Sequence, residues 1–487
     1  MSPLKPQAVC LLAAEVTPLS KTGGLADVAG ALARTLHALG HDVRVFTPRY
    51  AHIVPATAKA LPVRRLSVTV GTQSFSCTLL KGELPGGAPL YLIDCPELYA
   101  RASIYTADPD EHVRFLAFTR AALMACRALN WAPQVVHCND WHTGFAPLLL
   151  KTSYAAEPVF KSARTLLTIH NIGYQGIFPA TRAADLNLTP AQMPLLYQPD
   201  LTAGRINALR HGILYADAIN TVSPTHAREI ASDEYGMGLQ DSLRARAAVL
   251  SGILNGVDYQ EWDPRHDPVL PQHYDPQHLA VKAQLKAAFL SHLGVTTDPQ
   301  APLAGVVSRL AAQKGIELMF GALPQVLRSR ALNFVALGSG EAQYEVFFAK
   351  LAQDFPGRVH FHRGYDERLA HWIEAASDMF LMPSRYEPCG LNQMYSLRYG
   401  TVPIVRRTGG LADSVQHFDA DLGTGTGIVF NDFDVPALSW ALETALDLYA
   451  KPAAWERLVQ NGMAQDFSWT HQAAQYLALY ERLTAAA

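Results

Sequence analysis

The chain has 487 residues, of which 17% are charged and 49% are apolar, and its formal net charge is −3 at pH 7. This length exceeds what one hydrophobic core normally serves, so it predicts a globular protein of two or three domains. The nearly balanced charge, without any basic run, argues against a nucleic-acid or anionic-membrane partner. No apolar run is long enough to span a bilayer, and residues 1–16 lack the pattern of a cleaved signal peptide.

The cysteines are scattered along the chain, without paired or CxxC spacing. This distribution argues against a disulfide framework and predicts a reducing, cytoplasmic location. The six positions are Cys10, Cys77, Cys95, Cys126, Cys138 and Cys389.

The first half of the chain alternates buried strands with amphipathic helices. "AVCLLAA" (residues 8–14) is a continuous apolar run, which is typical of a parallel strand covered on both faces. Apolar residues then recur at spacings of three and four over residues 25–39, Gly40 stands at a helix C-cap position, and "DVRVFTP" (residues 42–48) predicts the next strand. This pattern predicts a βαβ unit whose helix begins at a glycine-rich loop.

The same alternation predicts strands in "APLYLID", "PQVVHCND", "RTLLTIHN" and "ADAINTVSP", with a helix at residues 225–230. A stretch rich in Pro, His and Asp at residues 261–278 predicts a linker. A second α/β set follows, with strands in "APLAGVVSRL", "LNFVALGSG", "RVHFHRG", "SDMFLMPS", "TVPIVRR" and "GTGIVF". The predicted fold class is therefore α/β, with two Rossmann-like domains that face a deep cleft.

The hexapeptide TGGLAD occurs twice, at residues 22–27 and 408–413. Each copy follows a predicted strand or its exit loop, begins a helix, and is preceded by a cation, Lys21 or Arg407. Glycines allow backbone N–H groups to approach a ligand, and a helix N-terminus favours negative charge. A simple chain turn is the alternative for either copy alone, and the flanking sequences give no sign of a duplicated domain.

In the second half, Arg309 and Lys314 flank a predicted strand exit, where both cations could reach one diphosphate. Solvated surface cations are the alternative interpretation. Glu387 lies in a Pro- and Gly-bounded loop beyond another strand, where a carboxylate could bind sugar hydroxyls or act only as a helix-start acid. Cys389 could be a reactive thiol, although a packed cysteine is the simpler interpretation.

In the first half, "VVHCNDWHTG" places His137, Cys138, Asp140 and His142 at one strand end. A transition-metal site is conceivable from these residue types, but the spacing is irregular and adjacent strand residues point to opposite faces. His170 in "TIHNIGYQG" and Asn255 in "LNGVD" follow other strands. A lone histidine usually serves only the fold, yet polar groups on several strand exits favour a sugar-binding wall.

Several nucleotide and hydrolase motifs are missing from the sequence. "LGSGE" (residues 337–341) is not a full GxGxxG fingerprint, so redox dinucleotide binding is not supported. The chain contains neither a GxxxxGK[ST] phosphate loop nor a GxSxG elbow.

The blocks "KTGGLADV", "HCNDWHTG", "HNIGYQG", "LNGVD", "SRLAAQKG", "SRYEPCGL" and "RRTGGLADSV" resemble, in this order, those of bacterial glycogen synthases and plant starch synthases. The resemblance covers residues 12–466 and implies an ADP-glucose-type α-1,4-glucan synthase of the GT-B fold. Such an enzyme elongates glycogen with retention of configuration and needs no metal or other cofactor. Its substrates would be ADP-glucose and an α-1,4-glucan.

The resemblance also implies domain limits: residues 1–260 form the acceptor-side domain, 261–278 the hinge, and 279–466 the donor domain. Residues 467–487 would form a helix that crosses back to the N-terminal domain. Closure about the hinge would bring Lys21 towards the donor diphosphate and exclude water.

The family's functional residues can be placed on matching positions of this chain. The resemblance implies catalytic roles for Glu387, Arg309, Lys314, His170 and Asp140. It implies donor contacts from Lys21, Gly23, Gly24, Asp27, Asn255, Tyr365, Cys389, Gly390, Leu391, Thr408, Gly409 and Gly410. It places Tyr105 and Asp140 on the acceptor side. Asn139 and Arg210 depart from the family pattern, in which His and Lys are usual.

The implied mechanism breaks the C1–O bond of the donor while negative charge moves to the leaving phosphate. Arg309, Lys314 and the second TGG loop would stabilise that charge. The acceptor 4-OH would attack from the same face, so Glu387 is expected to bind hydroxyls and not to act as a nucleophile.

Three alternatives remain at this point. A UDP-glucose-using or starch-type synthase would share these motifs, because nucleobase choice depends on a few loop residues. A glucan-binding protein without turnover would be expected to lack part of the catalytic set, which is complete here. A phosphorylase shares the two-domain architecture but needs a pyridoxal-phosphate lysine, whose family context is not seen.

Overall fold

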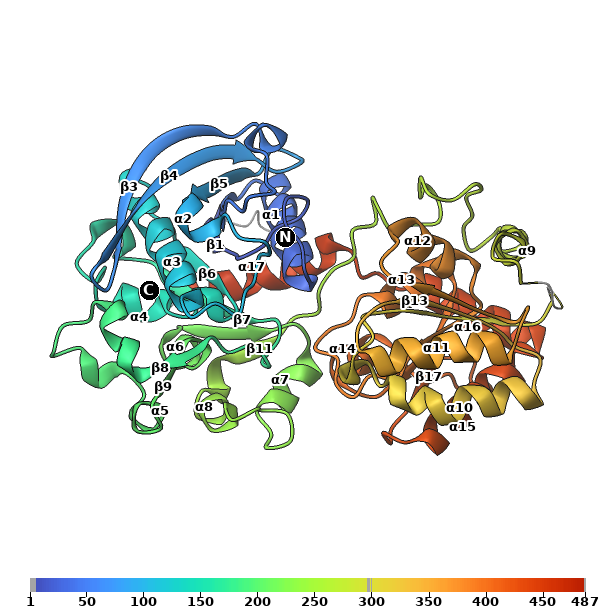
Figure 1. Cartoon of the computed structure of the whole chain (residues 1–487). Helices are drawn as coiled ribbons and strands as arrows, with labels where there is room; N and C mark the ends of the chain where they lie inside the picture. Colours follow the sequence, from blue (N-terminus) through green and yellow to red (C-terminus); the bar gives the residue numbers. More distant parts are fainter. Residues whose placement is uncertain (1–5, 296–297, 299, 486–487) are drawn as a thin grey trace. The chain divides into compact units, whose positions relative to one another are not determined.

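The structure is a computed structural model that describes residues 6–295, 298 and 300–485 (Figure 1). Its contacts define two compact units. The first unit comprises Met1–Val222, Ala227–Gly256 and Trp469–Ala487, and the second comprises Ser223–His226 and Val257–Ser468. The second unit is therefore inserted between two pieces of the first.

The first unit is built on a nine-stranded sheet with the order β11-β10-β7-β6-β1-β2-β5-β4-β3. The strands from β11 to β5 pair in parallel, whereas β4 and β3 form an antiparallel edge. The strands are β1 (Ala8–Leu12), β2 (Asp42–Pro48), β3 (Leu61–Val70), β4 (Gln73–Glu83), β5 (Pro89–Asp94), β6 (Val135–Asn139), β7 (Arg164–Ile169), β10 (Ala218–Thr221) and β11 (Leu250–Gly252). A separate antiparallel pair is formed by β8 (Ile177–Pro179) and β9 (Arg205–Asn207).

Helices pack on the first sheet through the apolar faces that the sequence pattern predicts. The α-helices before residue 257 are α1 (Gly24–Ala38), α2 (Pro96–Tyr99), α3 (Glu111–Ala128), α4 (Ala146–Lys151), α5 (Gln198–Thr202), α6 (Ala208–Tyr215), α7 (Pro224–Ile230) and α8 (Gln240–Ala245). In α1 the predicted stripe is buried except at its last residue, Leu39, which lies beyond the helix and is exposed. Gly40, the next residue, has φ +88°. That left-handed conformation suits glycine at a helix C-terminus.

The second unit is built on a six-stranded, fully parallel sheet with the order β14-β13-β12-β15-β16-β17. Its strands are β12 (Leu303–Val307), β13 (Asn333–Gly338), β14 (Val359–Arg363), β15 (Met379–Met382), β16 (Val402–Arg406) and β17 (Ile428–Phe430). Its α-helices are α9 (Ala280–His292), α10 (Ile316–Ser329), α11 (Ala342–Asp354), α12 (Glu367–Ala376), α13 (Asn392–Tyr399), α14 (Gly409–Ser414), α15 (Val435–Tyr449) and α16 (Pro452–Met463). All six strands were predicted from their short apolar runs.

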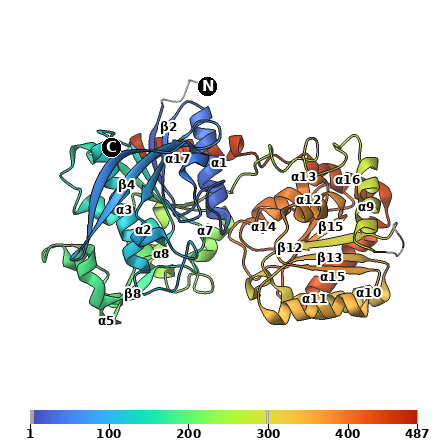
Figure 2. The same cartoon turned by 45° about the horizontal axis from the view of Figure 1, so that its top comes forward.

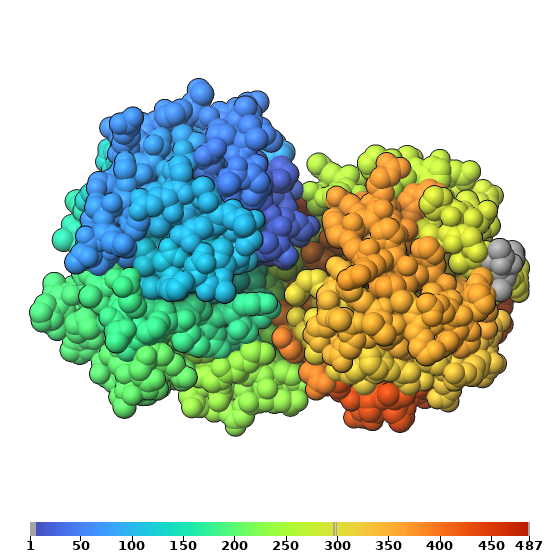
Figure 3. All heavy atoms as spheres, viewed as in Figure 1, coloured from blue at the N-terminus to red at the C-terminus, as the bar shows by residue number. Residues whose placement is uncertain are grey.

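The last helix, α17 (Trp469–Ala485), belongs to the first unit. It lies beside α1 in both ribbon views, where its red ribbon runs among blue elements (Figures 1 and 2). The Tyr480 hydroxyl shares a 2.8 Å hydrogen bond with Nδ1 of His137 in β6. On the face drawn in Figure 3, the surface of the first unit is formed by blue-to-green segments, which come from the first half of the chain.

The prediction of two α/β Rossmann-like domains with a C-terminal helix is confirmed. No helix in the described ranges combines the length and apolar character that a bilayer span requires. The hairpin of β3 and β4 was not predicted. Seven of the ten residues of β3 are exposed, and only its second half alternates between buried and exposed positions, which leaves a weak strand signal.

Candidate functional site

Each large sheet has one topological switch point, where the strand order reverses. In the first sheet it lies between β1 and β6, and in the second between β12 and β15. Ligands of open parallel sheets bind beyond the carboxyl ends of the strands at such points. Asp140 directly follows β6, Lys314 follows β12, and Glu387 follows β15. These three predicted residues therefore lie at the switch points of their own units, whereas Asn255 and Tyr365 follow the edge strands β11 and β14.

Asp140 has a strained backbone, with φ 53° and ψ −170°. A non-glycine residue adopts this positive φ only where the surrounding structure enforces it. Its Oδ1 accepts a hydrogen bond of 2.7 Å from the backbone N–H of His170. Burial raises the pKa of Asp140 to about 7. Strain together with a displaced pKa is typical of a functional carboxylate.

His170 is held in one tautomer by Asn139, one of the two departures from the family pattern. The Asn139 amide nitrogen donates to the Leu12 carbonyl, so its Oδ1 is free to accept the proton of His170 Nε2 at 2.8 Å. Burial lowers the pKa of His170 to about 3, so the ring is neutral at pH 7. Its Nδ1 is then a hydrogen-bond acceptor, and it is buried with no partner among the described residues. A substrate hydroxyl is a suitable donor for it.

Tyr105 and His142 present two further buried polar atoms, the Tyr105 hydroxyl and His142 Nδ1, which lack partners in the described part of the chain. Their rings stack with centroids 4.8 Å apart. Burial lowers the pKa of His142 to about 3, so this ring is also neutral. Since buried polar atoms are normally hydrogen-bonded, several without partners around one strand end indicate a place for a polar ligand.

The first TGG loop is open. A Cβ added at Gly23 or Gly24 would meet nothing within 4 Å. The Lys21 side chain is 52% exposed, and its Nζ lies 2.9 Å from Asp27 Oδ1. Asp27, the last residue of the first TGGLAD copy, thus pairs with Lys21, the residue just before that copy. Asn255, beyond β11 in the same unit, is buried.

Glu15 in this region was missed by the sequence analysis. It directly follows the apolar run that contains β1, and it is 3% exposed. A carboxylate at the end of a buried run, at the central strand of the sheet, was the signal that could have identified it. Its Oε2 accepts hydrogen bonds from the backbone N–H and the hydroxyl of Thr22.

In the second unit, the partly buried Lys314 forms an ion pair with the buried Glu387. Lys314 Nζ donates to Glu387 Oε2 at 2.6 Å, and the Ser384 hydroxyl donates to the same oxygen at 3.0 Å. Gly315 makes this approach possible, because a Cβ there would lie 2.0 Å from the Pro383 carbonyl oxygen and φ is +67°. Both contacts occupy Oε2, so the Glu387 carboxylate is held in place by the protein.

The other predicted donor residues differ in exposure. Arg309 is exposed, and its guanidinium makes no hydrogen bond or ion pair within the described ranges. Tyr365 is 77% exposed, whereas Cys389 is buried. Leu391 precedes α13, and Gly390 has φ +74°.

The second TGG loop is packed and not open. A Cβ at Gly409 would lie 1.9 Å from the Glu387 carbonyl oxygen, and one at Gly410 would lie 2.1 Å from that of Cys389. The Gly410 N–H donates to the Glu387 carbonyl at 3.1 Å. These glycines therefore serve first to hold the Glu387 loop against α14, and the Gly410 amide is occupied by the protein.

Possible metal ligands meet at one place in the described residues: ligand atoms of Glu261, Glu367 and His371 lie within 4.8 Å of one another. None of the three was predicted to contact substrate. His137, considered in the sequence as a metal ligand, uses Nδ1 for Tyr480 and Nε2 for Thr168. Both nitrogens thus serve the fold.

The chain matches two protein families along its length. Residues 8–245 match the family described as starch synthase catalytic domain, and residues 295–462 match glycosyl transferases group 1. The architecture and the matches define a glycosyltransferase of two Rossmann-like domains.

Full-length relatives narrow this class. The chain is 46% identical over 480 residues to a glycogen synthase of Anaeromyxobacter dehalogenans, covering 98% of this chain and 99% of the relative. It is 46% identical over 488 residues to one of Thioalkalivibrio sulfidiphilus, covering 98% and 99%. The catalytic domain of starch synthase IV from Arabidopsis thaliana, solved with ADP and acarbose, superposes with a TM-score of 0.90 at 34% identity, covering 99% and 100%. The chain belongs to the glycogen synthase family, which confirms the resemblance seen in its motifs.

Proposed function

We propose that the protein transfers glucose from ADP-glucose to the non-reducing 4-OH of an α-1,4-glucan, with retention of configuration. The observation that carries this proposal is the near-full-length identity to glycogen synthases, and the presence of the family's motif residues in the sequence supports it. The ADP and acarbose bound by the Arabidopsis relative support an adenine nucleotide donor and a glucan acceptor. The six free, buried cysteines support work in a reducing cytoplasm.

On the second unit, we propose that two cations bind the diphosphate that leaves from the donor. Arg309 has an uncommitted guanidinium, and Lys314 Nζ is paired only with Glu387, so both can move to a diphosphate. Cations placed where negative charge develops lower the barrier to C1–O cleavage. Thr408 and Gly409 remain proposed phosphate contacts, and Tyr365 a proposed nucleobase contact, while the occupied Gly410 amide is better assigned to shaping the loop.

On the first unit, we assign the sugar-binding groups. His170 Nδ1, the Tyr105 hydroxyl and the Asp140 carboxylate offer polar atoms for the hydroxyls of the transferred glucose and of the acceptor. Asn255 is assigned to the same task, and Lys21 to a donor contact. The acceptor 4-OH attacks from the face of the departing phosphate and gives its proton to the phosphate oxygen, which retains the configuration at C1.

The test measures ADP release with glycogen for wild type and Lys314→Ala. We expect kcat/KM to fall more than tenfold, which corresponds to about 1.4 kcal/mol of lost transition-state stabilisation. Lys350→Ala is the matched control, because Lys350 forms an exposed ion pair with Asp354 in the same unit. A loss of less than threefold in Lys314→Ala, or no ADP release by wild type, would contradict the proposal.

Initial rates with ADP-glucose and UDP-glucose at equal concentration test the nucleobase. We expect the adenine donor to react faster. A faster reaction with UDP-glucose would overturn the donor assignment while leaving the transferase class unchanged.

A further inference from the structure

Glu15 is a buried carboxylate at the switch point of the first sheet. Its Oε2 accepts two hydrogen bonds from Thr22, one from the backbone N–H and one of 2.9 Å from the hydroxyl. Thr22 lies between Lys21 and Gly23, so this carboxylate fixes the chain where the proposed donor-binding lysine begins the glycine loop.

At the tip of that loop, Lys21 is paired with Asp27 and Thr22 with Glu15. The base of the loop is closed by the backbone, since Ser20 N–H donates to the Val16 carbonyl. Gly23, the residue before α1, provides no side-chain cap, and the glycines face open space. A helix start without a cap is easily frayed, so the Thr22–Glu15 contact and the Lys21–Asp27 ion pair together set the position of Lys21.

Glu15 also neighbours the loop that carries Tyr105. Burial, and then the negative charge of Glu15, raise the pKa of the Tyr105 phenol. The Tyr105 hydroxyl is buried, and its interaction with Glu15 raises the pKa of the phenol and lowers that of the carboxyl, so the two groups lie close together.

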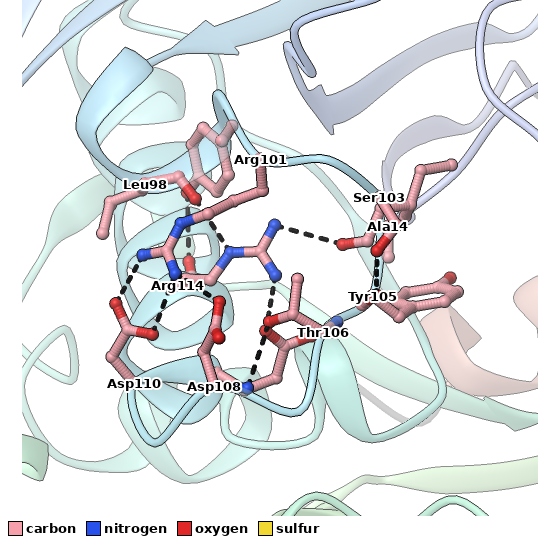
Figure 4. A network of polar contacts seen from close by, with 12 residues as sticks. Ala14, Leu98, Arg101, Ser103, Tyr105, Thr106, Asp108, Asp110 and Arg114 are labelled. Atoms are coloured by element: carbon pink, nitrogen blue, oxygen red, sulfur yellow. Dashed lines mark hydrogen bonds and ion pairs between the residues drawn. The ribbon is translucent and has the colours of Figure 1, made fainter.

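Two arginines brace the Tyr105 loop (Figure 4). Arg101 binds Asp108 and Asp110, with its Nη2 2.6 Å from Asp110 Oδ2. Arg114, fully buried, donates to the carbonyls of Leu98 and Ile104. The loop is therefore stiff, and a shift of Glu15 changes the surroundings of the Tyr105 hydroxyl without an easy compensating movement.

The carboxylate has no cation partner among the described residues, because Lys21 pairs with Asp27. A buried carboxylate without a cation lowers stability, and burial raises the pKa of Glu15 while the Thr22 hydrogen bonds lower it. A core position would serve stability better with an apolar residue. The geometry thus gives Glu15 a task other than stabilising the fold.

We propose that Glu15 is a positioning residue that holds the Lys21 loop through Thr22 and sets the environment of Tyr105, so that it couples the donor-side loop to an acceptor-side group. The proposal rests on the roles assigned to Lys21 and Tyr105 above. Glu15 itself need not touch either substrate.

The experiment measures kcat, both KM values and Tm for Glu15→Ala, Thr22→Val and Thr22→Ser. Thr22→Val removes the hydroxyl at constant shape, and we expect KM for ADP-glucose to rise about fivefold to tenfold. Thr22→Ser restores the hydroxyl and is expected to return KM to within twofold of wild type. Glu15→Ala is expected to raise KM for both ADP-glucose and the glucan, and Thr22→Val in that background should add less than twofold, because the shared contact is already lost.

Asp185→Asn is the matched control, since Asp185 is a buried carboxylate of the same unit paired with His112. It is expected to lower Tm while both KM values stay within twofold of wild type. Glu15→Ala with unchanged KM values, or a Thr22→Ser variant as impaired as Thr22→Val, would overturn the positioning role. If Glu15→Ala fails to fold, the two Thr22 variants decide.

Lys21→Ala and Tyr105→Phe separate this proposal from the one on which it rests. If both variants have wild-type kcat and KM values, the roles assigned to Lys21 and Tyr105 are wrong, and the role proposed for Glu15 is wrong as well. If both are impaired while the Glu15 and Thr22 variants are not, only the role of Glu15 is wrong.

Discussion

Asp140 combines a strained backbone with a carboxyl that is half ionised near neutral pH. Its pKa of about 7 lies well above the ordinary value of 3.8, and burial is the main cause. Because the folded state holds the proton more tightly than the unfolded state, ionisation of this group costs stability as pH rises from about 4 to 7. The protonated form of Asp140 is thus better for stability, whereas the ionised form is the one proposed to bind the acceptor.

We expect kcat/KM for the glucan to rise about tenfold between pH 6 and pH 8, because the ionised fraction rises by that factor around a pKa of 7. Asp140→Asn should remove this rise in kcat/KM with pH and should lower kcat/KM at pH 8. The same substitution should raise Tm relative to wild type more at pH 8 than at pH 5. Rate profiles and thermal melts across this range check both expectations, and an unchanged acid limb in Asp140→Asn would contradict the assignment.

At the residue scale, the sequence predicted the positions of the polar groups but not their states. We predicted Asp140, His170 and Glu387 as site residues because each follows an apolar run, and residues at the carboxyl ends of parallel strands meet at one edge of the sheet. The tautomer of His170 depends on an Asn139 contact from the neighbouring strand, and that contact needs the register of β6 and β7. The role of Glu15 likewise appears only once Thr22 is folded back on it.

At the element scale, the two identical hexapeptides begin two helices that differ in their surroundings. The glycines of the first copy line open space, and those of the second pack on the carbonyls of the Glu387 loop. Their acids differ as well: Asp27 binds Lys21, whereas Asp413 accepts hydrogen bonds from the backbone N–H and the hydroxyl of Thr225 within the second unit. Local sequence predicted the helix starts. It could not predict the neighbours of the second copy, because the Glu387 loop and Thr225 come from more distant parts of the chain.

Gly24→Ala and Gly410→Ala should therefore separate stability from activity. Gly24 is in the first turn of α1 with room for a methyl group, so alanine is expected to keep or raise stability by about 0.5–1 kcal/mol. Its kcat/KM for ADP-glucose should fall, because the methyl enters the space proposed for the donor. Gly410→Ala should lower both Tm and activity. Equal losses of Tm in the two variants would contradict this distinction.

At the scale of the whole molecule, the first unit is discontinuous. Its core includes Trp469, Tyr476 and Tyr480 of α17, which come after the entire second unit in the chain. The family resemblance predicted both this helix and the domain on which it would pack. Apolar periodicity shows which face of a helix is buried but does not identify the partner surface.

Tyr480→Phe should destabilise the first unit selectively. The substitution leaves His137 Nδ1 without its partner inside the core, which costs about 1–3 kcal/mol. Hydrogen exchange should show lower protection in β6 and α1, while β12 to β17 keep theirs. Tyr215→Phe is the control, because the Tyr215 hydroxyl bonds the Leu195 carbonyl at an exposed position. Equal loss of protection in both units would contradict this expectation.

The insertion of one unit between two pieces of the other also sets an order of events during synthesis. Chains emerge from the ribosome N-terminus first, and domains generally fold as units. The second unit can complete its core once residue 468 has emerged, whereas the core of the first unit is complete only after α17 has emerged. A chain that stops short of α17 lacks part of the core of the first unit. We therefore expect the first unit, and the sugar-binding groups that it carries, to become fully ordered only after translation is complete.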